Sequence, residues 1–300
     1  MKLPLRNVLL SAKDGLVQSK NLIWYHFDKF NWDLLYYKKN SSYLRDQHQI
    51  KARLSKGLSD PSKAINLYGT YHLGISPHIY SYYHLITDLL PHLIDAPKYP
   101  VLLPEFIPNS YTNFLRKVGF ETKILPPRDF LVENLYIPEI GEIDWNKKKI
   151  KLIQTFFEKN LVSKFFSNVN NSKFKKKIYI SRKLVKKRHL TNEEEFLPLL
   201  NKHNFKTVFL EKMSIQRQVQ LFRSSSHLIA PHGAGLTNVL FASTDIKILE
   251  VRPVLSSGKF CYEKLFSLGW PNYEIIVPPQ KGRFFLPLEE LEEVLLRWQK

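Results

Sequence analysis

The chain has 300 residues, 44% of them hydrophobic and 13% aromatic, which allows about two domains with sizeable cores and excludes a wholly disordered protein. It contains 45 Lys and Arg against 27 Asp and Glu, and its net charge of +18 favours phosphorylated ligands, polyanions or acidic membrane surfaces as partners. Its single cysteine excludes an intramolecular disulfide and a cysteine-based metal cluster, which suits a reducing compartment.

Aromatic and apolar runs predict strands in the first half of the chain, with helices between them. The helical spacing of apolar residues predicts a helix from Tyr82 to Leu93, which Pro91 kinks or ends. A second helix is expected over residues 110–118, ended by Gly119. Strands are expected at residues 21–25, 34–37, 64–68, 99–103, 121–125 and 135–137. This alternation predicts a parallel α/β sheet.

A long helix of mixed polar and apolar residues is expected from Asn146 to Phe166, and we place the domain boundary at its start. The chain then divides into an N-terminal domain of residues 1–145 and a C-terminal domain of residues 146–300. Within the second domain, strands are expected at residues 177–180, 205–210, 227–230 and 246–251, and helices at residues 192–203, 214–224, 236–241 and 287–300. Thr191 (through a capping box) and Ser214 are expected to cap two of these helices.

The expected strand at residues 227–230 runs directly into a loop with two glycines, Gly233 and Gly235, just before a helix. Glycine permits positive φ and a close approach to the backbone, and the N–H groups at a helix start favour a bound anion. The loop is therefore a candidate phosphate cradle, and the alternative is a tight strand-to-helix turn without a ligand. It does not fit the six-residue dinucleotide fingerprint, because no glycine follows Gly235 in the stretch up to Leu240, where a later glycine would be needed. The candidate ligand-binding residues of this stretch are His232, Gly233, Ala234, Gly235, Thr237 and Asn238, with Asn238 directed to a base or ribose.

Charged residues near other strand ends extend this candidate site. Arg182 follows the strand at residues 177–180 and can bind a diphosphate in a bidentate way, with Arg188 as a second candidate. Glu250 ends the strand at residues 246–251, where its carboxylate can accept both ribose hydroxyls. The alternatives are a solvated basic surface for the arginines and a surface ion pair with lysine for Glu250.

His84 and Asp88 lie four residues apart and therefore on one face of the expected helix. Either side chain can act as a general base that removes a proton from a hydroxyl group. His92 extends the row, and a His-x3-Asp-x3-His row can bind a metal, but no further ligand is visible in the sequence. The alternative is a pair that only forms a hydrogen bond and caps the helix.

Several motifs in order resemble glycosyltransferase family 61, which includes bacterial capsule and exopolysaccharide enzymes. The motifs are residues 82–91, residues 178–183 with Arg188 and residues 191–194, residues 218–222, residues 230–241 and residues 248–251. The resemblance covers roughly residues 60–255, and residues 1–60 match no pattern that we can name. It implies a GT-B architecture, in which two Rossmann-like halves face each other across a cleft, and inverting transfer from a nucleotide sugar, commonly a UDP-sugar.

With this resemblance, the sequence predicts a metal-independent hexosyl- or pentosyltransferase without a cofactor, for which the nucleotide sugar is a co-substrate. The N-terminal domain would bind a glycan or lipid-linked glycan acceptor of capsule, exopolysaccharide or lipopolysaccharide synthesis, and the C-terminal domain would bind the donor. Asp88 and His84 are the catalytic candidates, and which of them is the base stays open. Arg182 and the loop amides would stabilise the leaving diphosphate.

Two further expectations concern partners and location. A nucleic-acid-binding protein is the alternative function that the net charge of +18 suggests, but the sequence has no nucleic-acid-binding motif and its basic residues are scattered. No apolar run reaches the ~20 residues of a membrane-spanning helix, and the apolar run at residues 8–10 is too short for a signal peptide. We therefore expect a cytoplasmic protein, bound peripherally to the anionic inner face of the membrane and not to nucleic acid.

Overall fold

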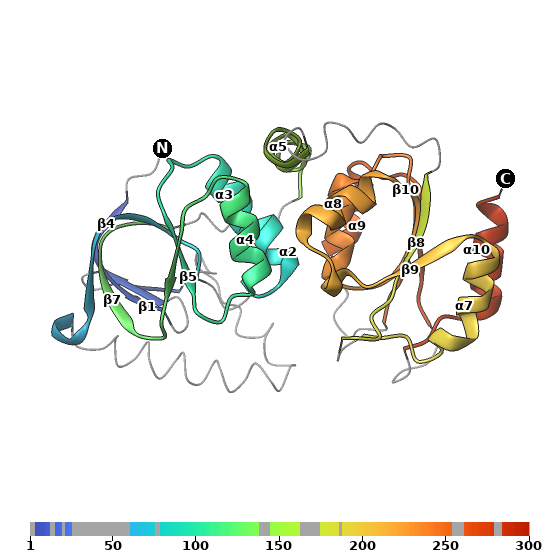
Figure 1. The fold of residues 1–300 in the computed structure, drawn as a ribbon, viewed down its shortest axis with the longest axis horizontal. Helices are drawn as coiled ribbons and strands as arrows, with labels where there is room; N and C mark the ends of the chain where they lie inside the picture. The colour runs from blue at the N-terminus through green and yellow to red at the C-terminus, as the bar shows by residue number, and fades with distance from the viewer. Residues whose placement is uncertain are drawn as a thin grey trace. The chain divides into compact units, whose positions relative to one another are not determined.

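A computed structural model describes residues 4–12, 16–19, 22–25, 61–75, 79–137, 145–162, 175–185, 188–253, 261–278 and 284–299. Contacts between residues divide the chain into two compact units, Met1–Asp144 and Trp145–Lys300. Each unit is an α/β structure with its own sheet, as Figure 1 shows. The strand expected at residues 34–37 lies outside the described residues. No helix within the described ranges is both long and apolar enough to cross a membrane.

The N-terminal unit contains a mixed seven-stranded sheet with the order β3-β2-β1-β7-β4-β5-β6. Its strands are β1 (Leu5–Ser11), β2 (Leu16–Ser19), β3 (Leu22–Tyr25), β4 (Ile65–Leu73), β5 (Val101–Pro104), β6 (Thr122–Leu125) and β7 (Asp129–Tyr136). Strands β7, β4, β5 and β6 are parallel, but β1, β2 and β3 pair antiparallel, and β1 is antiparallel to β7. The expectation of a purely parallel sheet is therefore wrong for this unit. The connections between β1, β2 and β3 are too short for the crossover that parallel pairing requires.

The helix predicted from Tyr82 to Leu93 is confirmed, but its middle is not α-helical. It consists of α2 (Tyr82–His84), a π-helical turn η2 (Leu85–Leu89) and α3 (Leu90–Ile94). Pro91 does not end the helix. It lies in the first turn of α3, directly after the π-turn, where the α-helical pattern of hydrogen bonds is already interrupted. A second helix, α4 (Asn109–Lys117), ends before Gly119, whose φ of 98° is in the left-handed region that favours glycine.

The C-terminal unit contains a five-stranded, fully parallel sheet with the order β12-β11-β10-β8-β9, consistent with a Rossmann-like domain. Its strands are β8 (Lys176–Ile180), β9 (Phe205–Val208), β10 (Ser225–Pro231), β11 (Lys247–Val251) and β12 (Tyr273–Ile276). Its helices include α5 (Lys147–Phe157), which a π-helical turn η3 (Glu158–Val162) continues, α7 (Glu193–Lys202), α8 (Ile215–Arg223), the 3-10 helix η5 (Ala234–Phe241), α9 (Cys261–Ser267) and α10 (Leu288–Arg297). In Figure 1, α8 and α9 cover one face of this sheet, and α7 and α10 cover the other.

The helix starts agree with the expected caps in one case and differ in another. Ser214 caps α8 as predicted, because its Oγ accepts a hydrogen bond from the Arg217 N–H at 3.3 Å. The capping box at Thr191 is wrong, because Asn192 occupies the N-cap of α7 and Thr191 Oγ1 donates to the Phe284 carbonyl instead. Asn192 itself exchanges two hydrogen bonds with the Leu286 backbone, at 2.8 and 2.9 Å. This entry into α7 is therefore held by contacts with a segment far away in the sequence. Helix α9 and strand β12 were not expected.

Candidate functional site

The strand order of the C-terminal sheet contains a switch in direction at β8. After β8 the chain continues to β9 on one side, and it then returns to place β10 on the other side of β8. In open α/β sheets, ligands bind outside the carboxyl ends of the strands at such a switch in direction. Arg182 follows β8 and the loop at Gly233 follows β10. The topology therefore brings the two predicted phosphate-binding segments to one place.

The half-buried guanidinium of Arg182 lies directly against the backbone of Gly233. A Cβ atom at Gly233 would overlap Arg182 Nη1 and would come within 2.9 Å of Cζ. Gly233 has φ and ψ of 172°, an extended conformation that any residue adopts. The expectation that this glycine provides positive φ is therefore wrong, and its role is to leave room for Arg182. At Gly235 a Cβ atom would lie 2.8 Å from Leu210 Cδ1, so this glycine permits close packing.

Arg182 lies near both a second positive charge and groups that favour its own charge. Burial and the neighbouring positive charge of Arg188 lower the pKa of Arg182, while Glu211 and Tyr262 act in the opposite direction. Arg188 is exposed and has a φ of 59°, which is uncommon for a residue with a long side chain. Two guanidinium groups that repel each other are both stabilised when a doubly charged anion binds near them.

Helix η5 begins at Ala234, two residues earlier than expected, with Gly233 at its N-cap. Ala234 and Gly235 contribute the first N–H groups of this helix, and such groups have no partner within the helix itself. The Leu236 N–H already donates to the Gly233 carbonyl at 3.0 Å. The start of η5 thus provides backbone donors beside Arg182, which is the arrangement that favours phosphate.

Thr237 and Asn238 are fully buried, and their polar atoms hold the loop in place. Asn238 Nδ2 donates to Gln218 Oε1 at 3.0 Å and to the Gly235 carbonyl at 3.1 Å. Thr237 Oγ1 lies 3.1 Å from the Tyr262 hydroxyl, which donates to the Gly233 carbonyl at 3.0 Å. The contact of Asn238 with a base or ribose and the role of Thr237 as a donor to the ligand stay predictions. Gln218 was noted only as part of a motif, and its contact with Asn238 had no signal in the sequence.

Glu250 is also fully buried and lies in a network of polar side chains. Its carboxylate accepts hydrogen bonds from His232 Nδ1, from the Tyr273 hydroxyl and, at 3.2 Å, from Arg252 Nη2. Burial raises the pKa of Glu250, but these hydrogen bonds outweigh burial and lower the pKa overall. The role of Glu250 as a ribose ligand stays a prediction, because its oxygens contact protein groups. Sequence reasoning missed Arg252 and Tyr273, although Arg252 lies only two residues beyond Glu250.

The contact with Glu250 determines which nitrogen of His232 carries the proton. A carboxylate only accepts hydrogen bonds, so the Nδ1 atom of His232 is the protonated one. In this tautomer the Nε2 atom is a hydrogen-bond acceptor. The contact with Glu250 also fixes the orientation of the His232 ring.

In the N-terminal unit, His84 and Asp88 form the pair that their spacing predicts. The distance from His84 Nδ1 to Asp88 Oδ2 is 2.6 Å, and Thr87 Oγ1 donates to Asp88 Oδ1 at 2.7 Å. The side chains of His84 and Asp88 are 24% and 13% exposed, so both are accessible to a substrate. Both oxygens of Asp88 accept hydrogen bonds, and His84 Nδ1 carries the proton between them. This geometry favours His84 as the base, with Asp88 orienting its ring.

His92 does not continue this row. Its ring lies 5.3 Å from the ring of His72, in an edge-to-face arrangement. His72 is buried, and its Nε2 atom lies 2.6 Å from the Pro97 carbonyl. Within the described residues, no group of three or more His, Cys, Asp or Glu side chains is arranged to hold a metal ion.

The predicted residues therefore form two groups, one in each unit. The donor candidates Arg182, Arg188, His232, Gly233, Ala234, Gly235, Thr237, Asn238 and Glu250 belong to the C-terminal unit, and the catalytic candidates His84 and Asp88 belong to the N-terminal unit. Within each group, polar side chains support one another through the hydrogen bonds described above.

Comparison with known proteins connects both groups to one family. A model of the glycosyltransferase 61 family matches residues 82–249, from the helix with His84 and Asp88 to a point within β11, just before Glu250. A Drosophila melanogaster protein described as EGF domain-specific O-linked N-acetylglucosamine transferase is 30% identical over 113 residues. That match spans 35% of this chain and 21% of the relative, so the chain corresponds to only about a fifth of that protein. Because the family match covers more than half of the residues, the chain belongs to glycosyltransferase family 61.

Proposed function

We propose that this glycosyltransferase transfers a hexose or pentose from a nucleotide sugar, in the first instance a UDP-sugar, to a glycan acceptor with inversion and without a metal. The observation that carries the proposal is the half-buried Arg182 guanidinium on Gly233, next to Arg188 and at the switch point between β8 and β10. This combination of fixed cations and backbone donors suits a diphosphate.

On the donor side, the bond between the sugar C1 and the phosphate oxygen breaks, and its electron pair remains on the diphosphate. Arg182 and Arg188 neutralise this developing charge, and the Ala234 and Gly235 N–H groups donate to the phosphate oxygens. His232, held by Glu250, adds a further contact with the donor substrate. Because these groups are already ordered by the protein, they need little reorganisation when the charge develops.

On the acceptor side, a hydroxyl oxygen attacks C1 from the face opposite the leaving diphosphate, so the configuration at C1 is inverted. The hydroxyl proton passes to His84 Nε2, and Asp88 stabilises the imidazolium through its hydrogen bond to Nδ1. This reaction requires the two units to face each other across a cleft, which is the GT-B arrangement that we propose for them.

The acceptor that we propose is a glycan or lipid-linked glycan of capsule, exopolysaccharide or lipopolysaccharide synthesis. The Drosophila relative is named for the transfer of N-acetylglucosamine to EGF domains, which makes N-acetylglucosamine the first sugar to test. We also propose a cytoplasmic protein that binds the inner membrane face through its positive charge.

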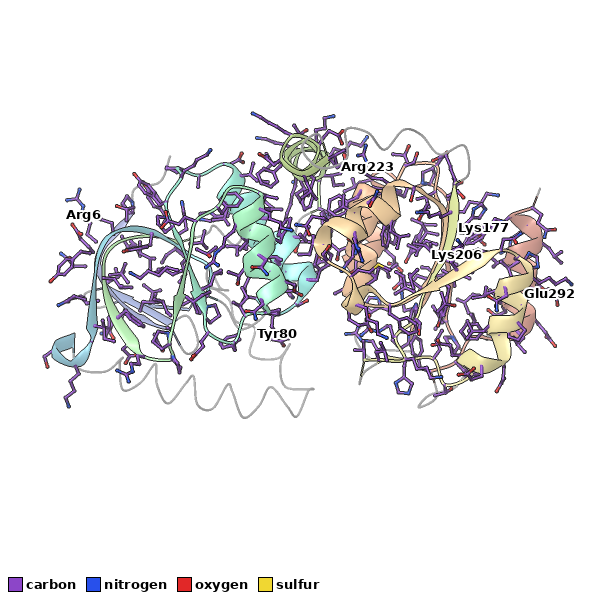
Figure 2. The ribbon with its side chains drawn as sticks, in the orientation of Figure 1. Arg6, Tyr80, Lys177, Lys206, Arg223 and Glu292 are labelled. Carbon is purple, nitrogen blue, oxygen red and sulfur yellow. The ribbon has the colours of Figure 1, made fainter. Side chains whose placement is uncertain are left out.

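Calorimetric titration with UDP and a panel of nucleotide sugars tests the donor site. We expect the wild-type protein to bind at least one of them and the Arg182→Ala variant to lose binding. Arg223→Ala is the matched control, because Arg223 (labelled in Figure 2) is exposed at the end of α8 and paired with Glu158 at 2.7 Å. Helix α8 leads into the amino end of β10, whereas the loop follows the carboxyl end of that strand. A wild-type protein that binds no nucleotide sugar and no nucleoside diphosphate would contradict the proposal.

Filter binding of RNA and DNA at two salt concentrations tests the nucleic-acid alternative.

A further inference from the structure

The buried carboxylate of Glu193 is hydrogen-bonded to the residue that precedes Arg182. Glu193 is the first residue of α7 and is 6% exposed. Its Oε1 atom accepts a hydrogen bond from Ser181 Oγ at 2.6 Å, and its Oε2 atom accepts one from the Tyr179 hydroxyl at 3.2 Å. Glu193 thus contacts Ser181, the residue between the end of β8 and Arg182, and Tyr179 within β8.

Ser181 joins this carboxylate to the backbone on both sides of Arg182. Its hydroxyl donates to Glu193 and accepts a hydrogen bond from the Lys183 N–H at 3.2 Å. The Ser181 N–H donates to the Val208 carbonyl of the neighbouring strand at 3.0 Å. Arg182 therefore lies between two residues whose positions depend on one fully buried hydroxyl.

The free-energy cost of burying the Glu193 carboxylate suggests that this residue does more than fill space in the core. A buried carboxylate costs free energy unless it is well bonded, and an apolar side chain of similar volume often gives equal or greater stability. Here both oxygens are bonded to hydroxyl groups, and the position at the start of α7 offsets part of the cost through the helix dipole. What this carboxylate adds is a defined geometry for the residues at the end of β8.

The other side of Arg182 is held by Gly233, whose missing Cβ leaves space for the guanidinium. The backbone next to Arg182 is bonded through Ser181, and its charged end occupies the space that Gly233 leaves. A group that stabilises a transition state must lie within ~0.5 Å of its productive position, which requires support of this kind.

We infer that Glu193, acting through Ser181, is a positioning residue that holds Arg182 in place for the diphosphate of the donor. The inference rests on the proposed function, because it assigns Arg182 to the donor. Glu193 itself does not contact the donor.

Two hydroxyl deletions separate this role from a general effect on stability. Ser181→Ala and Tyr179→Phe each remove one hydrogen bond to Glu193, but only Ser181 adjoins Arg182. The phenylalanine preserves the edge-to-face packing of residue 179 on Phe196. We expect Ser181→Ala to weaken UDP binding about tenfold or more in calorimetry, and Tyr179→Phe to change it less than twofold. Urea unfolding of both variants measures the loss of stability that accompanies each deletion.

Two further measurements test the coupling to Arg182. Glu193→Ala is expected to match Ser181→Ala, and Glu193→Gln is expected to recover most of the UDP affinity, because its amide oxygen can still accept from Ser181. In an Arg182→Lys background, Ser181→Ala is expected to weaken UDP binding by less than twofold, since residues that act as a unit are not additive.

The outcomes distinguish the inference from the proposed function. If the wild-type protein binds no nucleotide, the proposed function fails and the inference fails with it. If the wild-type protein binds UDP but Ser181→Ala and Tyr179→Phe weaken it equally, or the effect of Ser181→Ala is undiminished in the Arg182→Lys background, the inference alone is overturned.

Discussion

In the loop at Gly233, the space that a residue leaves matters as much as the groups that it carries. Gly233 is extended, and its importance comes from the Arg182 guanidinium that lies on it. Asn238 and Glu250 are buried, and they bond to the loop or to His232. A residue of a type that often binds ligands can therefore instead hold a neighbouring residue in place.

The space at Gly233 leads to a direct prediction. In Gly233→Ala, the new methyl group displaces Arg182, so UDP affinity should fall at least tenfold, which corresponds to about 1.4 kcal/mol. Gly269→Ala is the matched control, because a Cβ atom at Gly269 meets nothing within 4 Å. Calorimetric titration of UDP measures both variants. Unchanged affinity in Gly233→Ala would show that Arg182 does not contact the diphosphate.

The hydrogen bond between His84 and Asp88 predicts different roles for the two side chains. Asp88→Asn should lower kcat by about 10²- to 10⁴-fold, because the amide no longer holds the His84 ring in the tautomer that a base requires. His84→Ala should lower kcat by at least as much, and neither variant should change the dissociation constant of the donor. Steady-state transfer assays and calorimetry measure these quantities.

Asp95→Asn is the control for this pair, since Asp95 is an exposed residue at the C-cap of α3. Full turnover in Asp88→Asn would mean that His84 does not depend on Asp88, and full turnover in both variants would mean that the base lies elsewhere. A larger loss in Asp88→Asn than in His84→Ala would identify Asp88 as the base.

At the scale of elements, parallel pairing gathers positive charge at the amino ends of the C-terminal strands. His227 on β10 is in register with Lys177 on β8 and with Lys247 on β11. Lys206 lies on the neighbouring strand β9, as Figure 2 shows. Burial, followed by the charges of Lys177 and Lys247, lowers the pKa of His227 from 6.5 to about 4. The folded protein therefore keeps this imidazole neutral.

This pKa predicts how acid affects stability. Between pH 6.5 and about 4, the unfolded state binds a proton at residue 227 that the folded state does not, so the free energy of unfolding falls as the pH falls through this range. In His227→Phe, which keeps an aromatic ring beside Phe205 and Trp298, this fall should be smaller. Urea unfolding at several pH values measures it. An equal slope in both proteins would mean that His227 is not the titrating group.

At the scale of the whole molecule, the division into two units separates the donor candidates from the catalytic pair. The net charge of +18 belongs to the chain as a whole, and it supports the proposed attachment to anionic lipid. Such attachment is electrostatic, with about 1 kcal/mol for each Lys or Arg close to the surface.

Flotation with lipid vesicles tests this attachment. We expect the protein to float with vesicles rich in phosphatidylserine and not with vesicles of phosphatidylcholine alone. Raising the salt to about 1 M should release it, because the Debye length then falls to about 3 Å. Protein that stays unbound with anionic vesicles at low salt, or that remains bound at high salt, would contradict an electrostatic attachment.

The sequence by itself determined the features that depend on neighbouring residues. The helix at Tyr82, the cap at Ser214 and the stop at Gly119 follow from local periodicity, hydrogen bonding and backbone conformation. The pairing of His84 with Asp88 follows from helical spacing alone. The family resemblance is likewise carried by local motifs, and the family match bears it out.

Only the tertiary structure determined which residues far apart in the sequence form hydrogen bonds with each other. Glu250 bonds with Tyr273, and Glu193 bonds with Ser181, because strands and helices bring these groups together from separate parts of the chain. The position of β1 between β2 and β7 in the N-terminal sheet likewise depends on which strands become neighbours in the fold. Local patterns report whether a side chain is apolar and how it repeats. They do not report which buried donor will meet which acceptor, and that depends on how the complete sheet and its helices pack.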